Sequence, residues 1–256
     1  MITDAQKKEL ISLVINLGKE AETIKKESLD IDWKSDKSPL TKADLYVNER
    51  LNLFCMRTEF TKIVSEENAS ISFNERRGWE YFWLIDPIDG TKEFIQKGND
   101  YTINIALCKS NSPIFSVVYA PARKELYYAE IGKGAFKNDE RLNVRTKATN
   151  NELKVVASKS HLNYETEEFI KSISKDYQIS LVQFGSSLKI CKVAEGIADL
   201  YPRFGPTMEW DTCASDLVLR EAGGYLLDLN SKNLTYNKND LLNSHFIASS
   251  SQHWCK

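Results

Sequence analysis

The feature that most restricts the fold is the apolar segment at residues 81–85 together with the residues that follow it. Its near-continuous apolar character predicts a buried β-strand that stops at Asp86. The chain then reads Pro87-Ile88-Asp89-Gly90-Thr91, in which the proline stiffens a turn. We therefore expect a buried strand with two carboxylates at its end, followed by a glycine turn that opens a helix.

These two carboxylates predict a metal site. Asp86, Asp89 and the backbone carbonyl of Ile88 between them are hard oxygen ligands of the kind that suit Mg²⁺. Glu66 at the end of another predicted strand and Asp211 at the start of a predicted helix are candidates for a third and a fourth carboxylate. Because carboxylates gathered around one point repel each other, such a cluster needs bound cations.

The same turn predicts phosphate binding. Gly90 lets the backbone approach a ligand closely, and the N–H groups of Gly90 and Thr91 at a helix start would bind an anion. Metal ions beside a bound phosphate can polarise the phosphoryl oxygen and lower the pKa of a bound water. The pattern thus indicates hydrolysis by metal-activated water, with no need for a covalent phosphoenzyme.

Each part of this pattern also has a simpler structural interpretation. An isolated pair of aspartates three residues apart is a weak signal, and Glu66-Glu67 alone is more often a solvated strand end. Asp211 alone is more often a helix cap. The combination of these acids with a glycine turn in one chain favours the metal site.

The first half is predicted to contain two helices followed by a mostly antiparallel sheet. Helical spacing of apolar residues covers residues 4–28 and a second segment that begins at Thr41, which forms a capping box with Asp44. Short β-branched and aromatic runs predict the strands of the sheet at residues 62–65, 81–85, 102–108, 114–119 and 125–130.

The second half alternates strands and helices, which indicates an α/β layer. Strands are predicted at residues 154–157, 179–184, 199–201 and 225–229, and helices at 164–175, 187–195 and 212–222. Gly223-Gly224 is placed to end the last helix in a left-handed conformation. A polar stretch at residues 146–152 separates the halves, so the predicted domains are 1–148, of the α+β class, and 149–256, of the α/β class.

Composition excludes several classes of protein. The 256 residues are 42% hydrophobic and 27% charged, as in an ordinary globular protein. The net charge of -2 argues against binding a nucleic-acid polymer. The five cysteines form no C-x-x-C pair and indicate reduced thiols. With neither a secretory leader nor an apolar run of about 18 residues, we expect a cytoplasmic protein with no transmembrane segment.

Two segments carry a resemblance to a known family. Residues 83–95, which read W-L-I-D-P-I-D-G-T-K-E-F-I, resemble the first signature of the inositol monophosphatase superfamily. Residues 209–214, E-W-D-T-C-A, together with Glu221-Ala222-Gly223-Gly224, resemble the second. The similarity extends from the N-terminal helix nearly to the C-terminus. It implies an α/β fold, the layered αβαβα sandwich of the inositol monophosphatase and fructose-1,6-bisphosphatase type.

Within the superfamily, Gly90-Thr91-Lys92-Glu93-Phe94 is similar to the 3'(2'),5'-bisphosphate nucleotidases, whereas inositol monophosphatases typically read Gly-Thr-Thr-Asn-Phe there. The segments at 158–161, 185–189 and 200–207 point the same way. The resemblance implies a sulfur-metabolism enzyme that removes the 3'-phosphate of adenosine 3',5'-bisphosphate (PAP) to give AMP. Its sulfated analogue PAPS is a further candidate substrate, and inhibition by Li⁺ is typical of the family.

The resemblance also implies a ligand set and roles, carried over by motif position. Two to three Mg²⁺ ions would be held by four carboxylates and one carbonyl, with Asp86 bridging two ions: Glu66, Asp86, Ile88, Asp89 and Asp211. Asp44, Thr91 and Glu66 are the expected catalytic residues. Asp44 and Thr91 would be hydrogen-bonded to each other, and would orient and deprotonate the attacking water.

For the substrate, the resemblance implies that Ser186, Lys189 and Arg203 hold the nucleotide and its second phosphate, with Asp211 beside them and His161 near the base or sugar. A bisphosphate carries roughly -3 to -4 charge near neutral pH. The metals would neutralise only the phosphate being cleaved, so a lysine and an arginine suit the other one. Without the motif context these cations would be interpreted as ordinary surface residues, and the histidine as structural.

Two other functions stay open. Another phosphatase of the superfamily, acting on inositol phosphate or another sugar phosphate such as fructose 1,6-bisphosphate, would share the metal site. A non-catalytic protein that binds a metal or nucleotide is disfavoured because every expected acid is present. Both a monomer and a homodimer fit, as does loose association with the inner face of the cell membrane. Cys213, where relatives commonly have alanine, is expected to pack in the core, and Trp33 has no assigned role.

Overall fold

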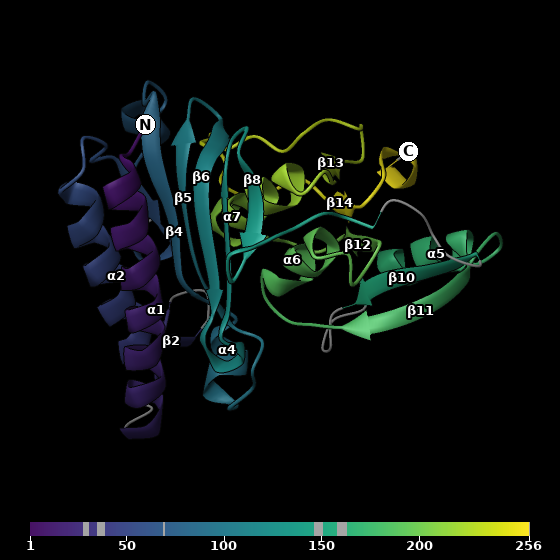
Figure 1. Cartoon of the computed structure of the whole chain (residues 1–256), viewed down its shortest axis with the longest axis horizontal. Helices are drawn as coiled ribbons and strands as arrows, with labels where there is room; N and C mark the ends of the chain where they lie inside the picture. The colour runs from purple at the N-terminus through teal and green to yellow at the C-terminus, as the bar shows by residue number, and fades with distance from the viewer. Residues whose placement is uncertain (28–30, 35–38, 69, 146–150, 158–162, 256) are drawn as a thin grey trace.

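The computed structural model describes residues 1–27, 31–34, 39–68, 70–145, 151–157 and 163–255. Five layers follow one another across the molecule (Figure 1): a helix pair, a seven-stranded sheet, a second helix pair, a five-stranded sheet and an outer helix. The predicted α/β fold with an αβαβα sandwich is therefore confirmed. In the part of the chain that is described, no helix is both long and apolar enough to cross a membrane.

The first layer contains α1 (Asp4–Glu27) and α2 (Lys42–Met56), both predicted. Each buries one apolar face, which includes Leu10 and Val14 of α1 and Leu51 of α2. The predicted capping box is present, because Thr41 caps α2 and Asp44 accepts hydrogen bonds from its backbone and hydroxyl. A short antiparallel ribbon of β1 (Ile31–Trp33) and β2 (Pro39–Thr41) precedes α2 and was not predicted.

The seven-stranded sheet has the order β3-β4-β5-β6-β7-β8-β9 and is antiparallel except for the parallel pair β3–β4, as predicted. Its strands are β3 (Ile63–Ser65), β4 (Tyr81–Asp89), β5 (Thr102–Lys109), β6 (Ser112–Ala120), β7 (Glu125–Glu130), β8 (Gly134–Lys137) and β9 (Glu140–Arg141). The connections include η1 (Glu66–Asn68), α3 (Phe73–Arg76), α4 (Thr91–Ile95) and η2 (Pro121–Arg123).

The strand that begins at Tyr81 was predicted to stop at Asp86, and this prediction is wrong. β4 continues to Asp89, and its pairing with β5 shifts register between Asp86 and Asp89. The apolar pattern stops at the first carboxylate, but the backbone goes on pairing across an irregularity of the ladder. The backbones of Asp86 and Asp89 are therefore held by pairing with β5 on either side of this irregularity.

The five-stranded sheet has the order β11-β10-β12-β14-β13, with parallel pairing of β10 to β11 and β12, and antiparallel pairing of the rest. Its strands are β10 (Glu152–Ala157), β11 (Gln178–Gln183), β12 (Leu200–Arg203), β13 (Tyr225–Asp228) and β14 (Phe246–Ser249). The predicted alternation is confirmed, whereas β14 was missed. The terminal η3 (Gln252–Cys255) follows it.

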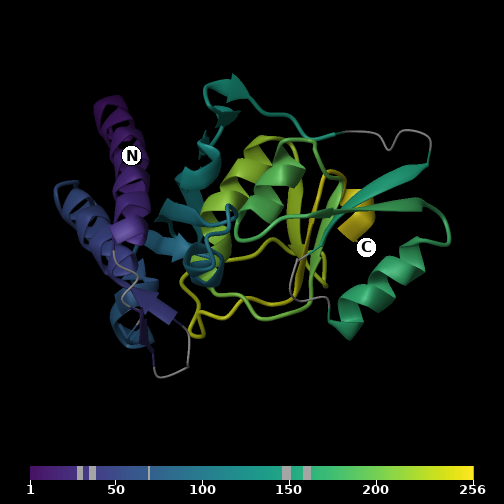
Figure 2. The same cartoon turned by 90° about the horizontal axis from the view of Figure 1, so that it is seen from below.

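Helices α6 (Leu188–Ala194) and α7 (Glu209–Glu221) lie between the two sheets, and α5 (Tyr164–Ile173) covers the outer face of the smaller one (Figures 1 and 2). α7 starts earlier than predicted and ends before Gly223, which has the expected positive φ of 92°. Leu217 of α7 belongs to the same apolar cluster as Phe82 of β4. The two predicted halves thus share a core. The predicted boundary at residue 148 lies outside the described residues.

Candidate active site

A cavity of about 530 Å³ lies where the two halves meet. From the first half its lining includes Asp89, Gly90 and Thr91, which follow one another at the end of β4. From the second half it includes four of the predicted residues: Ser186, Lys189, Arg203 and Asp211. Segments roughly a hundred residues apart in sequence therefore meet around one space, and both acids and cations line it.

Gly90 makes the turn that the sequence predicted. It adopts a φ of +88° and precedes α4, and a Cβ placed on it would lie 3.2 Å from the carbonyl oxygen of Asp100. Only glycine combines this backbone conformation with such a close approach at low cost. The helix has just five residues, with Thr91 as its first. Binding of phosphate by the N–H groups of Gly90 and Thr91 stays a prediction.

Asp86 is almost fully buried at 1% exposure, and its Oδ1 has no hydrogen-bond partner among the described residues. Burial raises the pKa of this carboxyl well above its ordinary value, and the charges of Glu66, Asp89, Asp211 and Asp44 raise it further. A buried oxygen without a donor, surrounded by other acids, is the arrangement that a bound cation would stabilise. The residues present therefore fit a divalent metal ion.

Asp211 lies in the first turn of α7, where its Oδ2 accepts the backbone N–H of Met208 at 2.9 Å. Burial raises its pKa to about 8, and the charge of Asp89 contributes to the rise. The capping interpretation and the metal interpretation are compatible here. One carboxylate oxygen caps the helix, and the other is available to a ligand in the cavity.

Asp89 receives three hydrogen-bond contacts on one oxygen. Its Oδ2 lies 2.7 Å from the hydroxyl of Ser186, 2.6 Å from the backbone nitrogen of Ser187 and 2.8 Å from the Ser187 hydroxyl. The Ser187 hydroxyl also lies 2.6 Å from the carbonyl oxygen of Asp211. Ser187 was missed as a site residue, although it stands beside Ser186 in the segment that carried the resemblance.

Asp44 and Thr91 are brought together from α2 and α4. The Thr91 hydroxyl lies 3.4 Å from Asp44 Oδ1 and 3.1 Å from the carbonyl oxygen of Ile88. Oδ2 of Asp44 accepts the Thr41 backbone N–H at 2.8 Å. Burial raises the pKa of Asp44 to about 6, against the lowering effect of the Thr41 hydrogen bonds. The capping acid thus also faces the predicted site.

Glu66 is paired with a lysine that the sequence analysis did not consider. Lys34 Nζ lies 2.7 Å from a carboxylate oxygen of Glu66 and 2.7 Å from one of Glu67. Burial would lower the pKa of Lys34, but its hydrogen bonds to both glutamates outweigh this and raise it. In the described ranges, no group of three or more Asp, Glu, His or Cys side chains is arranged so that it could hold a metal ion without rearrangement. Lys34 stands beside a polar stretch without periodicity, so no local signal marks it.

The lining of the cavity also contains two cations, Lys189 and Arg203. Lys189 Nζ lies 5.6 Å from the centre of the Tyr201 ring, and burial lowers its pKa. Arg203 donates from Nη2 to the carbonyl oxygen of Pro206 at 2.9 Å, while its buried Nε has no partner in the part of the chain described. A guanidinium that lines a cavity is suited to an anionic ligand. His161 and the rest of 158–162 lie outside the described residues.

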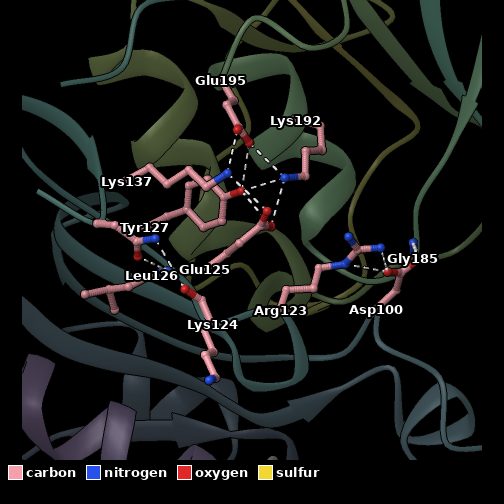
Figure 3. Close-up of polar contacts among 11 residues, drawn as sticks. Asp100, Arg123, Lys124, Glu125, Leu126, Tyr127, Lys137, Gly185, Lys192 and Glu195 are labelled. Carbon is pink, nitrogen blue, oxygen red and sulfur yellow. Dashed lines mark hydrogen bonds and ion pairs between the residues drawn. The ribbon is translucent and has the colours of Figure 1, made fainter. Parts of the chain in front are cut away.

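Helix α6, which carries Lys189, is tied to the first sheet by a charged cluster (Figure 3). Lys192 Nζ lies 2.8 Å from oxygens of both Glu125 and Glu195 and 2.9 Å from the Tyr127 hydroxyl. Lys137 of β8 lies 2.5 Å from Glu195. The cluster holds one face of α6 against β7 and β8, and so sets where the helix presents its other face to the cavity.

The two residues without an expected role are also placed. Cys213 is buried, with its Sγ 3.4 Å from that of Cys108, as expected for core packing. Trp33 is 68% exposed on β1. Neither lines the cavity.

Comparison with known proteins gives a consistent result. The profile of the inositol monophosphatase family matches residues 4–254. The 3'(2'),5'-bisphosphate nucleotidase CysQ of Haemophilus influenzae is 35% identical over 247 residues, which cover 93% of this chain and 90% of that protein. The protein of the same name from Escherichia coli K12 is 39% identical over 225 residues, covering 86% of this chain and 89% of that protein.

A solved structure is similar over almost its whole length. The crystal structure of CysQ from Bacteroides thetaiotaomicron, described as a bacterial member of the inositol monophosphatase family, superposes with a TM-score of 0.84 at 38% sequence identity. The match covers 95% of this chain and 97% of that one. The similarity therefore includes both sheets and the helices between them.

Proposed function

Because the chain belongs to the inositol monophosphatase family, we propose that it is a 3'(2'),5'-bisphosphate nucleotidase. In this proposal it hydrolyses the 3'-phosphate of PAP to give AMP and phosphate, with PAPS as a further substrate. The observation that carries the proposal is the cavity, whose lining combines the carboxylates of Asp89 and Asp211 with the cations of Lys189 and Arg203. A substrate with two phosphates matches such a site, because acids with bound metal ions can hold one phosphate and the cations can hold the other.

Metal dependence is typical of this family, in most members on Mg²⁺. In the proposal two to three ions are held by four carboxylates and one carbonyl, of which Asp89 and Asp211 line the cavity: Glu66, Asp86, the carbonyl of Ile88, Asp89 and Asp211. The unpartnered Oδ1 of Asp86 and the raised pKa values of Asp86 and Asp211 support this set. Bound Mg²⁺ would supply polarisation of the phosphoryl oxygen and a lowered pKa for a water molecule.

The chain's own groups orient that water and receive its proton. The Thr91 hydroxyl, shared between Asp44 Oδ1 and the Ile88 carbonyl, provides a fixed hydrogen-bonding group beside the carboxylate. A carboxyl with a pKa of about 6 is poised to accept a proton near neutral pH, and Asp44 Oδ1 is the oxygen not engaged by Thr41. Glu66 completes the proposed catalytic set.

Binding of the second phosphate is assigned to the two cations of the cavity lining. Arg203 offers its guanidinium, and Lys189 a point charge, to the phosphate that is not cleaved. Ser186 lines the same cavity, but its hydroxyl donates to Asp89. The geometry therefore supports a role for Ser186 in orienting that acid as well as in contacting the nucleotide.

The test is turnover with Mg²⁺ on PAP, PAPS, inositol 1-phosphate and fructose 1,6-bisphosphate under one set of conditions. We expect PAP to be preferred by at least roughly 10-fold in kcat/KM, the effect of one additional charged contact. Preference for inositol 1-phosphate would refute the substrate and favour a sugar phosphatase. Absence of Mg²⁺-dependent phosphate release from all four would favour the non-catalytic alternative.

Four further properties of the protein stay predictions from the sequence. These are a cytoplasmic location, a monomer or homodimer, loose attachment to the inner face of the cell membrane, and inhibition by Li⁺. Each is open to direct measurement, by fractionation, light scattering and a Li⁺ titration of turnover.

A further inference from the structure

The segment at residues 184–187 enters the site from the second half in a strained conformation. Ser186 adopts a φ of +53°, which is uncommon for a residue other than glycine. Its hydroxyl and the backbone N–H of Ser187 nevertheless both reach Oδ2 of Asp89. A backbone in this region persists only when its surroundings hold it there.

Asp100, which comes just before β5, holds Gly185 of this segment. It is 2% exposed, and its Oδ2 accepts the backbone N–H of Gly185 at 3.1 Å. The two backbones are in close contact, because a Cβ on Gly185 would lie 2.8 Å from the Cβ of Asp100. The turn is therefore pinned on one side by Asp100 and on the other by Asp89.

Arg123 at the end of η2 holds Asp100 in turn (Figure 3). Its Nε lies 2.8 Å from Oδ1 of Asp100, and Nη2 contacts the same oxygen. The guanidinium carbon also lies 5.3 Å from the ring centre of Phe184, the residue before Gly185. One arginine thus contacts both the acid that pins the turn and the residue from which the turn begins.

We infer that Asp100 and Arg123 are positioning residues for the metal-side carboxylate Asp89. Neither lines the cavity. Their effect passes through Gly185 to Ser186 and Ser187, whose donors fix Oδ2 of Asp89 and so orient the other oxygen. Hydrogen bonds that orient a metal ligand in this way commonly control metal affinity. The inference rests on the proposed metal role of Asp89.

The principal test variant is Arg123→Gln, which removes the charge and the paired nitrogens, and Arg123→Lys is its conservative partner. The chain offers a matched control in Arg145→Gln. Arg145 lies 3.2 Å from Asp199, whose Oδ2 also accepts a backbone N–H, at 2.8 Å from Lys154. The side-chain exposures are alike, 29% and 2% for Arg123 and Asp100 against 19% and 2% for Arg145 and Asp199.

The first measurement is amide hydrogen–deuterium exchange of peptides that cover residues 184–187 in metal-free protein. We expect faster exchange in Arg123→Gln, intermediate exchange in Arg123→Lys and no change in Arg145→Gln. The second measurement is the Mg²⁺ dependence of Tm for each protein. We expect the apparent Mg²⁺ affinity to fall roughly 10-fold in Arg123→Gln, the low end of the range for groups behind a ligand, and not in Arg145→Gln.

A result in which Arg123→Gln and Arg145→Gln lose similar Tm and have the same Mg²⁺ response would overturn the inference. Wild-type protein without any Mg²⁺-dependent shift would refute the link to a metal ligand. Neither measurement uses a substrate, so failure of the wild type to hydrolyse PAP would count against the proposed function alone. If Arg123→Gln does not fold, the near-isosteric Asp100→Asn is subject to the same two outcomes.

Discussion

At the scale of single residues, Asp89 shows how one carboxylate serves both the fold and the site. Its Oδ2 is fully engaged by the donors of Ser186 and Ser187, which join the second half of the chain to the first. Asp89 itself lines the cavity, so its other oxygen is the one available to a ligand there. Asp211 and Asp44 repeat this division, since each uses one oxygen as a helix cap. Hydrogen bonds on one oxygen therefore orient the acids that a cation would need.

Asp89→Asn is expected to abolish most activity with little effect on folding. The amide oxygen can still accept from Ser187, but the second position becomes a neutral NH₂ that cannot bind a cation. We expect kcat/KM to fall by at least roughly 100-fold, because several kcal/mol of charge stabilisation are lost, while Tm without metal stays close to that of the wild type. Near wild-type turnover would show that Asp89 is not a metal ligand.

Replacing both Lys189 and Arg203 by alanine tests the substrate side. These cations contact no part of the reacting phosphate in the proposal, so their loss removes binding that is the same in the ground state and the transition state. KM for PAP should rise by roughly 10-fold or more, with kcat little changed. A 3'-monophosphate, 3'-AMP, serves as the control, because it lacks the second phosphate and its KM should be unaffected. An equal loss on both nucleotides would contradict the assignment.

At the scale of elements, α6 is positioned by charge rather than by apolar packing alone. Burial would raise the pKa values of Glu125 and Glu195, but hydrogen bonds from Lys192 and Lys137 outweigh it and lower both. These carboxylates thus stabilise the fold in their charged form. That contribution is present above the unfolded pKa and is lost as the pH falls through the lowered folded values.

Lys192→Met should destabilise the protein while keeping the length of the side chain. The substitution leaves Glu125 and Glu195 facing each other with only Lys137 to compensate, and unpairing buried charges costs about 3 kcal/mol or more. Urea unfolding near pH 7 measures this loss. Lys171→Met is the control, because its pair with Glu168 is exposed and should contribute less than about 1 kcal/mol. Equal stability of the two variants would contradict the role of the cluster.

At the scale of the whole molecule, the acids converge where the two halves meet, and this convergence makes folding depend on pH. The pKa of Asp211 rises from 3.8 to about 8, that of Asp44 rises to about 6, and that of Asp86 rises well above its ordinary value. Between the unfolded and folded values the folded protein retains protons that the unfolded chain releases. Stability of the metal-free protein must therefore fall as the pH rises through this interval.

We accordingly expect Tm of the metal-free protein to decrease as the pH is raised from about 4 to about 8, on account of these carboxyls. Saturating Mg²⁺ should reduce the decrease, because a bound cation stabilises the deprotonated acids. Differential scanning calorimetry with EDTA and with Mg²⁺ across this range measures both effects. Identical pH profiles with and without Mg²⁺ would contradict a metal site built from these acids.

Much of the fold could be predicted because it depends on neighbours in sequence. The capping box of Thr41 and Asp44 and the left-handed Gly90 turn are determined within a few residues by sterics and local hydrogen bonds. The apolar run before Asp86 likewise predicts a buried strand from its own pattern. The continuation of β4 to Asp89 could not be predicted in this way, since it depends on the partner strand β5.

The amino-acid sequence alone predicts acids beside the glycine turn and at the start of α7, and from them the class of chemistry. The partners of the acids depend on how the chain packs: Ser187 on Asp89, 98 residues away, Lys34 on Glu66, 32 residues away, and Arg123 on Asp100. The two kinds of contact differ in the distance along the sequence that they span. Caps and turns are set by backbone geometry over one turn of chain, whereas these hydrogen bonds form only after two sheets and the helices between them have packed.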